Sequence, residues 1–461
     1  MSDVEQTKKK TRSFNLTEGA VHKHLIRMAL PMIIGLTASM SFTFVDSYFI
    51  AQLGTDEVAA MGFVSRMVMI YFSVAIGLSA GVTSVLARVA GSGDQEEVKK
   101  LATNTLIMTA ILSLAISIFG YLAIDPIFTA MGANADVLPH VREYMMIWYL
   151  SPLFVILPMT GGGVMRALGD TKLQGNLMLI SALANAALDP LLIFGLYGFP
   201  ELGFAGAAWA SLITRFISFA VILYALQYQY HVICFSKDTL STFFASLKKI
   251  LYVGIPATGT NIIIPIVAAM VISIVARYGT EAVAATHVAT TIEMISLVLF
   301  FSTSAVVGPF IGQNLGAGRF DRIDECIKNI SIFCMAWGLF VAIVIALTAP
   351  TLAGLFRKEP EIIALAERYL YVVPISYGLY GIVMSMNAMF NSLGKPMPGV
   401  AISSIRVFFL QLPLFYFASE FYGLEIAFIT ISVSNVIAGV IGYLWIKNTI
   451  NKLKTHKKGP F

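Results

Sequence analysis

Residues 33–53 read IIGLTASMSFTFVDSYFIAQL, an apolar run whose one acidic residue is Asp46. A helix of about 20 apolar residues crosses a bilayer core, so this run predicts a membrane span. A carboxylate in mid-membrane costs roughly 2.5–3.5 kcal/mol on insertion scales. A second run, residues 177–199, repeats the pattern with Asp189. Acids in such places mostly face a cavity, a partner or an ion path, so these two indicate what drives the protein.

The composition of the whole chain agrees with these two runs. Of its 461 residues, 57% are hydrophobic and 12% are charged, whereas soluble domains carry about 25% charged residues. The apolar segments are too long and too uniform for transmembrane β-strands. We therefore predict an all-α integral membrane protein with twelve spans, at about 25–52, 58–88, 100–123, 139–162, 173–197, 204–230, 249–276, 282–313, 327–350, 363–391, 398–418 and 424–447.

The positions of the basic residues predict the orientation. With the N-terminus in the cytoplasm, the inner tails and loops hold 23 of the 31 Lys and Arg residues, including the basic stretch 8–12. The outer loops hold only five: Arg142, Arg277, Arg357, Lys358 and Arg368. Cytoplasmic loops carry an excess of Lys and Arg, so we expect a multi-pass protein of the plasma (inner) membrane with both termini in the cytoplasm. The orientation then explains the net positive charge, and we expect no nucleic-acid partner.

The two halves of the chain are copies of one unit. At one constant offset, GTDEVA at 54–59 meets GTEAVA at 279–284, and GSG at 91–93 meets GAG at 316–318. The offset is slightly shorter near the sixth span, where Gly203 meets Gly423. A single internal duplication, with a small change of loop length, explains these matches.

Each copy contains six spans, so both copies cross the membrane in the same direction as parallel repeats. In transporters of this design the substrate path lies between the halves. We expect a cytoplasmic tail at 1–24, an N-lobe at 25–232, a linker at 233–248, a C-lobe at 249–447 and a cytoplasmic tail at 448–461.

Several polar residues are placed to join the two acids. Asn185 and Asp189 are four residues apart and so share a helix face, and Asp46 and Asp189 both lie in the outer halves of their spans. Two nearby carboxylates repel each other when ionised, and burial disfavours their charged forms. Such a site can take up a proton, whereas two carboxylates and an amide oxygen also suit sodium. Tyr144, at the outer end of the fourth span, can hydrogen-bond a carboxylate or act as an interfacial anchor.

The duplication limits where coupling by acids can occur. The repeat partners of Asp46 and Asp189 are Val271 and Leu414, so these acids belong to the N-terminal copy alone. Three other charged residues lie deep in spans, where a structural pair and a transport role both remain open: Arg215, Glu293 and Arg406. Pro31 has a proline repeat partner, Pro256, which favours a functional bend because proline removes an intrahelical hydrogen bond.

No enzyme or metal motif competes with transport. The sequence has no P-loop and no metal-ligand spacing, so we expect a protein that is not an enzyme, has no cofactor and is driven by a proton or sodium gradient.

Five stretches together resemble motifs of the multidrug and toxic compound extrusion (MATE) transporters. They are GQNLGAGR at 312–319, RALGD at 166–170, IRMALP at 26–31, FVDS at 44–47 and NAALDP at 185–190. The resemblance covers nearly the whole chain and is specific in combination. It implies a V-shaped fold of two six-helix lobes, acting as a monomer that exports organic cations or amphipathic drugs as protons or sodium ions enter.

The resemblance also implies roles for particular residues. In the prokaryotic DinF-like branch, the coupling network would consist of Asp46, Tyr144, Asn185 and Asp189, with Pro31 as the residue linked to bending. Some members of that branch place a threonine of the sixth helix near the cation. The corresponding stretch here, residues 205–209, reads AGAAW without threonine, which favours protons slightly.

Three other functions fit the sequence less well than drug efflux. A lipid-linked oligosaccharide flippase of the same superfamily needs a large cationic cavity, and the few deep arginines and the paired acids argue against one. A transporter of the major facilitator type usually carries a Gly-x-x-x-Asp-Arg-type loop, which residues 88–94 do not match. A membrane receptor or scaffold would not explain two acids in one repeat.

Overall fold

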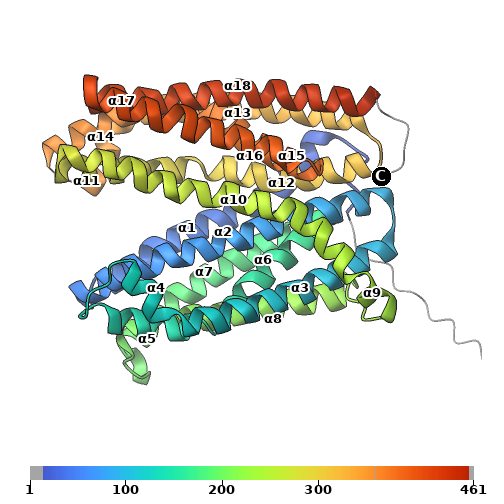
Figure 1. Ribbon diagram of the computed structural model, residues 1–461, viewed down its shortest axis with the longest axis horizontal. Helices are drawn as coiled ribbons and strands as arrows, with labels where there is room; N and C mark the ends of the chain where they lie inside the picture. The colour runs from blue at the N-terminus through green and yellow to red at the C-terminus, as the bar shows by residue number, and fades with distance from the viewer. Residues whose placement is uncertain (1–13, 358, 456–461) are drawn as a thin grey trace, which may run out of the picture.

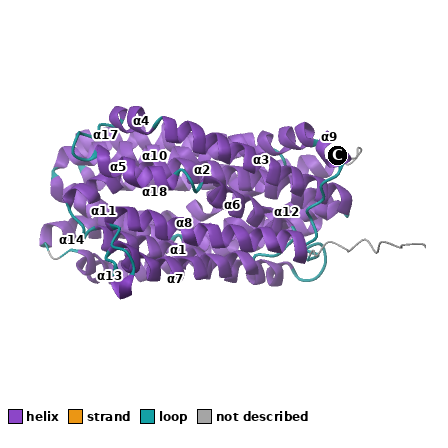
Figure 2. Cartoon of the chain, turned by 90° about the horizontal axis from the view of Figure 1, so that it is seen from below, coloured by secondary structure: helices purple, strands orange, loops and turns teal. Residues whose placement is uncertain are grey.

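The computed structural model describes residues 14–357 and 359–455, and in that part it consists of helices joined by loops and turns, without strands (Figure 2). The helices form two lobes that lie side by side (Figure 1). The basic stretch 8–12 and Lys358, which contributed to the orientation prediction, lie outside the described residues. The predicted tails at 1–24 and 448–461 are therefore described only in part.

The helices follow the predicted order of spans. The N-lobe contains α1 (Val21–Ile50), α2 (Thr55–Ser92), α3 (Gln95–Leu122), α4 (Ile124–Ala130), α5 (Leu138–Trp148), α6 (Pro152–Ala167), α7 (Lys172–Ile193), η1 (Leu196–Gly198), α8 (Gly203–Tyr224) and η2 (Ala225–Gln229). The linker contains α9 (Lys237–Ser241). The C-lobe contains α10 (Phe243–Val275), η3 (Ala276–Tyr278), α11 (Thr280–Ser296), α12 (Val298–Gly316), α13 (Phe320–Phe356), α14 (Pro360–Val372), η4 (Val373–Ser376), α15 (Tyr377–Ser392), α16 (Pro396–Ser404), η5 (Ile405–Gln411), α17 (Leu412–Tyr422) and α18 (Leu424–Thr455).

The predicted fold class is confirmed, with one broken span in the N-lobe. Among the described residues, eleven helices are long and apolar enough to cross a membrane, or up to twelve if the bent pair α5 and α6 forms one span. These two helices meet at 52°, where the sequence predicted one segment at 139–162. Pro152 opens α6 at its first position, where proline is tolerated because its missing N–H would have no helical partner.

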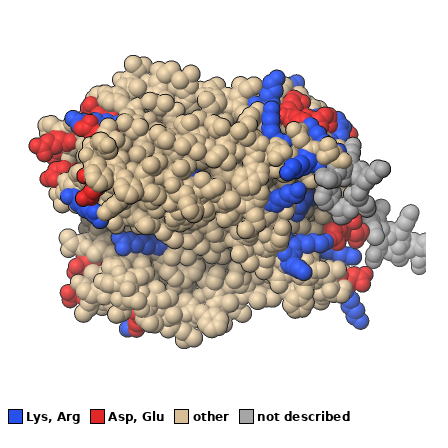
Figure 3. Space-filling model, turned by 45° about the horizontal axis from the view of Figure 1, so that its top comes forward, with Lys and Arg blue, Asp and Glu red and all other residues tan. Residues whose placement is uncertain are grey.

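Charged residues mark the two ends of the molecule. Lys and Arg gather at the end that carries α9 and the last turns of α18, whereas the other end mixes both signs, and the broad middle is mostly uncharged (Figure 3). We call these the α9 end and the α14 end. An uncharged band between two charged ends is the arrangement that a bilayer requires.

The lobes meet at the α9 end through a symmetric contact between α2 and α12. Gly91 of α2 lies against the backbone of Gln313, and Gly316 of α12 lies against the carbonyl of Arg88. Gly91 and Gly316 are repeat partners, and so are Arg88 and Gln313. A contact that exchanges equivalent residues has two-fold symmetry, as parallel repeats predict.

The segment 14–19 ties the lobes together at the same end. Leu16 donates its N–H to Gln313 (3.1 Å), while Asn314 and Arg322 donate to the Leu16 carbonyl (3.2 and 3.0 Å). On the N-lobe side, Phe14 donates its N–H to the Leu168 carbonyl (2.8 Å). Part of the GQNLGAGR stretch therefore binds the start of the chain to both lobes.

The N-lobe forms a core of its own towards the α14 end. Ile50, Val64, Tyr144, Ile193 and Phe204 belong to one buried cluster whose members all come from the N-lobe. The C-lobe core, by contrast, includes residues from the start of the chain at the α9 end, among them Leu16 and Met28. The lobes are thus closed against each other at the α9 end.

This closure predicts the effect of adding one methyl group between α2 and α10. A Cβ on Gly81 would lie 2.6 Å from the Ile250 carbonyl, which is too close for a real contact. We expect Gly81→Ala to open the α9 end. Spin labels at Lys172→Cys and Lys328→Cys, in a background without native cysteines, should then show longer distances by double electron–electron resonance.

Gly62→Ala is the matched control on the same helix, because nothing lies within 4 Å of a Cβ at Gly62. Both variants gain the same helix propensity, about 1 kcal/mol. Equal distance distributions for the two variants would show that the α2–α10 contact does not hold the lobes closed.

Candidate functional site

Asp46 lies near the end of α1 that points to the α14 end. Its side chain is buried, with 8% exposed, and its Oδ1 has no hydrogen-bond partner in the part of the chain that is described. Buried polar atoms are paired in most native proteins. An acid with unused acceptor capacity inside a membrane protein is therefore a candidate for binding a cation.

Asp189 belongs to a hydrogen-bonded network between α7 and α8. The Nδ2 group of Asn185 donates to Asp189 Oδ1 (2.9 Å), one turn along α7. Thr214 of α8 donates its hydroxyl to Asn185 Oδ1 (3.1 Å), and Ser211 approaches the same oxygen at 3.4 Å. These contacts orient the amide so that its NH₂ group faces Asp189, whose Oδ2 is buried without a partner among the described residues.

Tyr144 and Arg215 complete the site from α5 and α8. The charge of Asp46 acts on Asp189, Tyr144 and Arg215, so these side chains lie within electrostatic range of one another. Tyr144 is 4% exposed and packs on the ring of Phe204, with ring centroids 5.0 Å apart. The four predicted coupling residues thus come together in one cluster, which we call the N-lobe site.

The N-lobe site brings two buried acids within electrostatic range of each other. Two carboxylates held close together in an apolar surrounding repel each other, and a bound proton or metal cation removes that repulsion. Among the described residues there is no group of three or more His, Cys, Asp or Glu that could hold a metal ion. A sodium ion would therefore need the amide and hydroxyl oxygens around Asn185 in addition to the two acids.

Pro31 lies at the other end of α1 from Asp46. The helix continues through it from Val21 to Ile50, and its carbonyl lies against Gly175 of α7. Thr171 donates its hydroxyl to the Met28 carbonyl (2.7 Å), one turn earlier. Because Gly175 has no side chain, α1 and α7 can pack closely at this point. A bend at Pro31 stays a prediction.

Sequence reasoning missed Thr214 and Ser211. Residues 205–209, the stretch where a threonine of the sixth span was expected, contain none, whereas Thr214 lies about two turns further along α8 and contacts Asn185. The argument for protons from the missing threonine therefore loses its force. The helical spacing of Ser211, Thr214 and Arg215, three and four residues apart, was the available signal that they share one face.

Comparison with known proteins agrees with this architecture. The MatE family model matches residues 31–191 and again 256–417, so each lobe carries one copy, and the two matches begin at the paired prolines Pro31 and Pro256. A relative named "FAD transporter", from Shewanella oneidensis, is 32% identical over 428 residues, which cover 93% of this chain and 95% of that protein.

Solved structures of the same kind superpose on both lobes. The Vibrio cholerae MATE transporter VcmN in its bent form has a TM-score of 0.88 and 31% identity, covering 93% of this chain and 97% of that one. A multidrug resistance MATE family transporter in an outward-facing conformation has a TM-score of 0.91 and 26% identity, covering 97% and 100%.

Members of this family are secondary transporters and not enzymes. Two matches to the family model, the relative at 32% identity and the superposition of both lobes all lead to the same assignment. The chain is a multi-pass membrane protein that belongs to the MATE family of transporters.

Proposed function

We propose that this protein is a secondary active exporter in which the N-lobe site couples entry of a cation to release of an organic substrate. The observation that carries this proposal is the burial of Asp46 and Asp189 in one cluster, where the charge of Asp46 acts on Asp189. Ionisable residues inside membranes are rare, and they mark ion and proton pathways.

The orientation of the molecule supports export. The α9 end carries most of the basic residues (Figure 3), and by the positive-inside rule it faces the cytoplasm. The closure of the lobes at that end then corresponds to an outward-facing conformation. In this conformation the N-lobe site lies in the outer half of the membrane, where protons or sodium ions from outside reach it first.

Cation binding would act through α1. With Asp46 and Asp189 both ionised, their repulsion works against close packing of α1 on α7; a bound cation removes it. The contact between Pro31 and Gly175 lies on the same helix pair, at the opposite end. A change in how α1 packs on α7 would alter the space between the lobes and release the substrate outward.

Replacing either acid by its neutral amide tests the coupling. We expect Asp46→Asn and Asp189→Asn to lower ion-driven transport at least about tenfold, because the amide can hold neither the proton nor the charge that a cation needs. The measurement is substrate movement in proteoliposomes, with proton and sodium gradients imposed separately, which also identifies the driving ion.

The control is Asp125→Asn, because Asp125 is an exposed acid that pairs with Arg142 at the α14 end. It should keep normal transport. Full ion-driven transport by Asp46→Asn at normal expression would refute the proposed mechanism.

A second variant tests the positioning of Asn185. Thr214→Val removes a hydroxyl that fixes the amide, and a lost hydrogen bond costs about 1 kcal/mol. We expect the concentration of the driving ion at half-maximal rate to rise about fivefold. Thr290→Val is the matched control, because among the described residues the Thr290 hydroxyl donates only to the Thr286 and His287 carbonyls of its own helix. The same shift in both variants would argue against a role for the α8 hydroxyls.

The relative at 32% identity supports a second candidate substrate. It is named an FAD transporter, and FAD combines an apolar flavin ring with an anionic pyrophosphate, unlike the organic cations expected from sequence. Both classes are amphipathic, so a substrate path between the two lobes could serve either. The flippase alternative has no comparable support among the relatives reported above.

Substrate competition separates the two candidates. Proteoliposomes loaded with FAD or with a fluorescent organic cation should release one of them in a gradient-dependent way, and Asp46→Asn should stop that release. Release of the cation with no release of FAD, and no competition by FAD, would eliminate the flavin nucleotide as a substrate.

A further inference from the structure

The C-lobe contains a polar cluster at the place that corresponds to the N-lobe site. Tyr369 of α14 is the repeat partner of Tyr144, and both side chains are 4% exposed. The partner positions of Asp46 and Asp189 carry no acid. The tyrosine shows that the duplication preserved this part of the site.

A pair of hydrogen bonds is also preserved between the lobes. Ser151 and Ser376 are repeat partners, and each donates its hydroxyl to the carbonyl three residues earlier (2.7 and 2.8 Å). Arg215 donates to Ser151 (3.3 Å), and Asn435 donates to Ser376 (3.0 Å). Arg215 and Asn435 also occupy equivalent positions, at the same spacing as Gly203 and Gly423 in the last span of each copy.

The acid of the C-lobe cluster comes from a different helix. Val271 and Leu414 occupy the positions of Asp46 and Asp189, but Glu293 of α11 reaches the same place. Tyr369 donates its hydroxyl to the Glu293 carboxylate. The charge of Arg406, on η5, also acts on Glu293.

Arg406 is held in place by partners other than Glu293. It donates to Asn435 (3.0 Å), and its guanidinium lies 4.7 Å from the centroid of the Tyr380 ring. It can therefore keep its position and its charge when Glu293 becomes neutral, because a cation over an aromatic face is stabilised without an anion.

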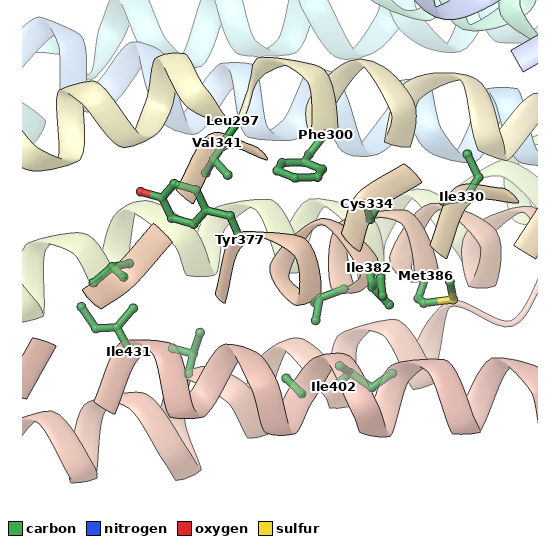
Figure 4. Close-up of a cluster of buried hydrophobic side chains, with 14 of the residues drawn as sticks. Leu297, Phe300, Ile330, Cys334, Val341, Tyr377, Ile382, Met386, Ile402 and Ile431 are labelled. Atoms are coloured by element: carbon green, nitrogen blue, oxygen red, sulfur yellow. The ribbon is translucent and has the colours of Figure 1, made fainter. Parts of the chain in front are cut away.

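Tyr377 supplies an unused donor beside the acid. It has no exposed surface, and its hydroxyl has no hydrogen-bond partner among the described residues. In Figure 4 that hydroxyl points away from the apolar side chains of Ile382 and Met386. The charge of Glu293 acts on Tyr377, so the hydroxyl is available to a carboxyl group that leaves its contact with Tyr369.

We propose that Glu293 is a second proton-binding residue of the transport cycle, located in the C-lobe and independent of the N-lobe acids. The titratable and charged groups that act on it are Tyr369 on α14, Tyr377 on α15 and Arg406 on η5, and Tyr380 on α15 acts in turn on both tyrosines. A proton from water on the open side binds the carboxylate, and it leaves to water on the other side after the lobes rearrange. Sodium is disfavoured, because it needs several oxygen ligands around the carboxylate, whereas a proton needs only the carboxylate itself.

The inference rests on the proposed function, since it adds a proton to the cycle of a secondary transporter. At equilibrium, the logarithm of the substrate ratio across the membrane rises with the pH difference, with a slope equal to the number of protons exchanged. We expect Glu293→Gln to lower this slope by one in proteoliposomes at clamped membrane potential, while leaving any response to a sodium gradient unchanged.

Glu281→Gln is the matched control, because Glu281 is an exposed acid in the first turn of the same helix. It should keep the wild-type slope. An unchanged slope for Glu293→Gln would overturn the inference, and it would leave the proposed function intact if Asp46→Asn still abolished coupling. Normal coupling in Asp46→Asn would instead refute the proposed function.

A measurement on the wild-type protein does not depend on folding of the variant. Dicyclohexylcarbodiimide reacts with protonated carboxyl groups in apolar surroundings, and mass spectrometry locates the adduct. We expect labelling at Glu293 that declines as the pH rises. No adduct at Glu293 at any pH, with labelling of Asp46 or Asp189 as the positive control, would refute proton binding at this residue.

Discussion

The backbone contact between α2 and α12 at the α9 end determines how the two lobes can move. Gly91 and Gly316 bring two helices together where any side chain would collide with the backbone opposite. Because the same residues of each repeat exchange places across the contact, it lies on the axis that relates the lobes. Rotation about such a point separates the far ends most, and the N-lobe site lies far from it. A small rotation of the lobes at the contact therefore produces a larger displacement of the helices beside the two acids.

Much of this architecture follows from the sequence, because apolar length and repeated motifs are local signals. The twelve spans, the duplication and the partnership of Asn185 with Asp189 needed only run lengths, offsets and helical spacing. Helix breaks were harder to predict. Pro31 and Pro256 lie inside continuous helices, whereas Pro152 opens a new helix after a break. Proline alone does not locate a break, since neighbouring groups can satisfy the carbonyl that it leaves free.

The residues that sequence reasoning missed share one property. Thr214 contacts Asn185 from another helix, and Tyr369 contacts Glu293 from another helix. The sequence places Glu293 and Arg406 deep in their spans, but it does not show that they meet Tyr369. Which faces of separate helices meet is decided by packing, which one sequence does not record. Equal positions in the two copies also do not predict the C-lobe acid, because Glu293 lies on a different helix from the N-lobe acids, whereas the tyrosine is at the equal position. The duplication preserved a polar framework and changed the charged groups within it.

The segment 14–19 has a consequence for how the protein is made. Its partners Gln313 and Arg322 lie about 300 residues later in the chain. At roughly 5–20 residues per second, a ribosome needs about 15–60 s to synthesise the interval between them. For that time the segment 14–19 has its N-lobe contact, from Phe14 to the Leu168 carbonyl, but none of its C-lobe partners. The N-lobe must therefore hold its two buried acids without help from the C-lobe, and its hydrogen-bonded network around Asn185, made entirely of its own residues, allows it to do so.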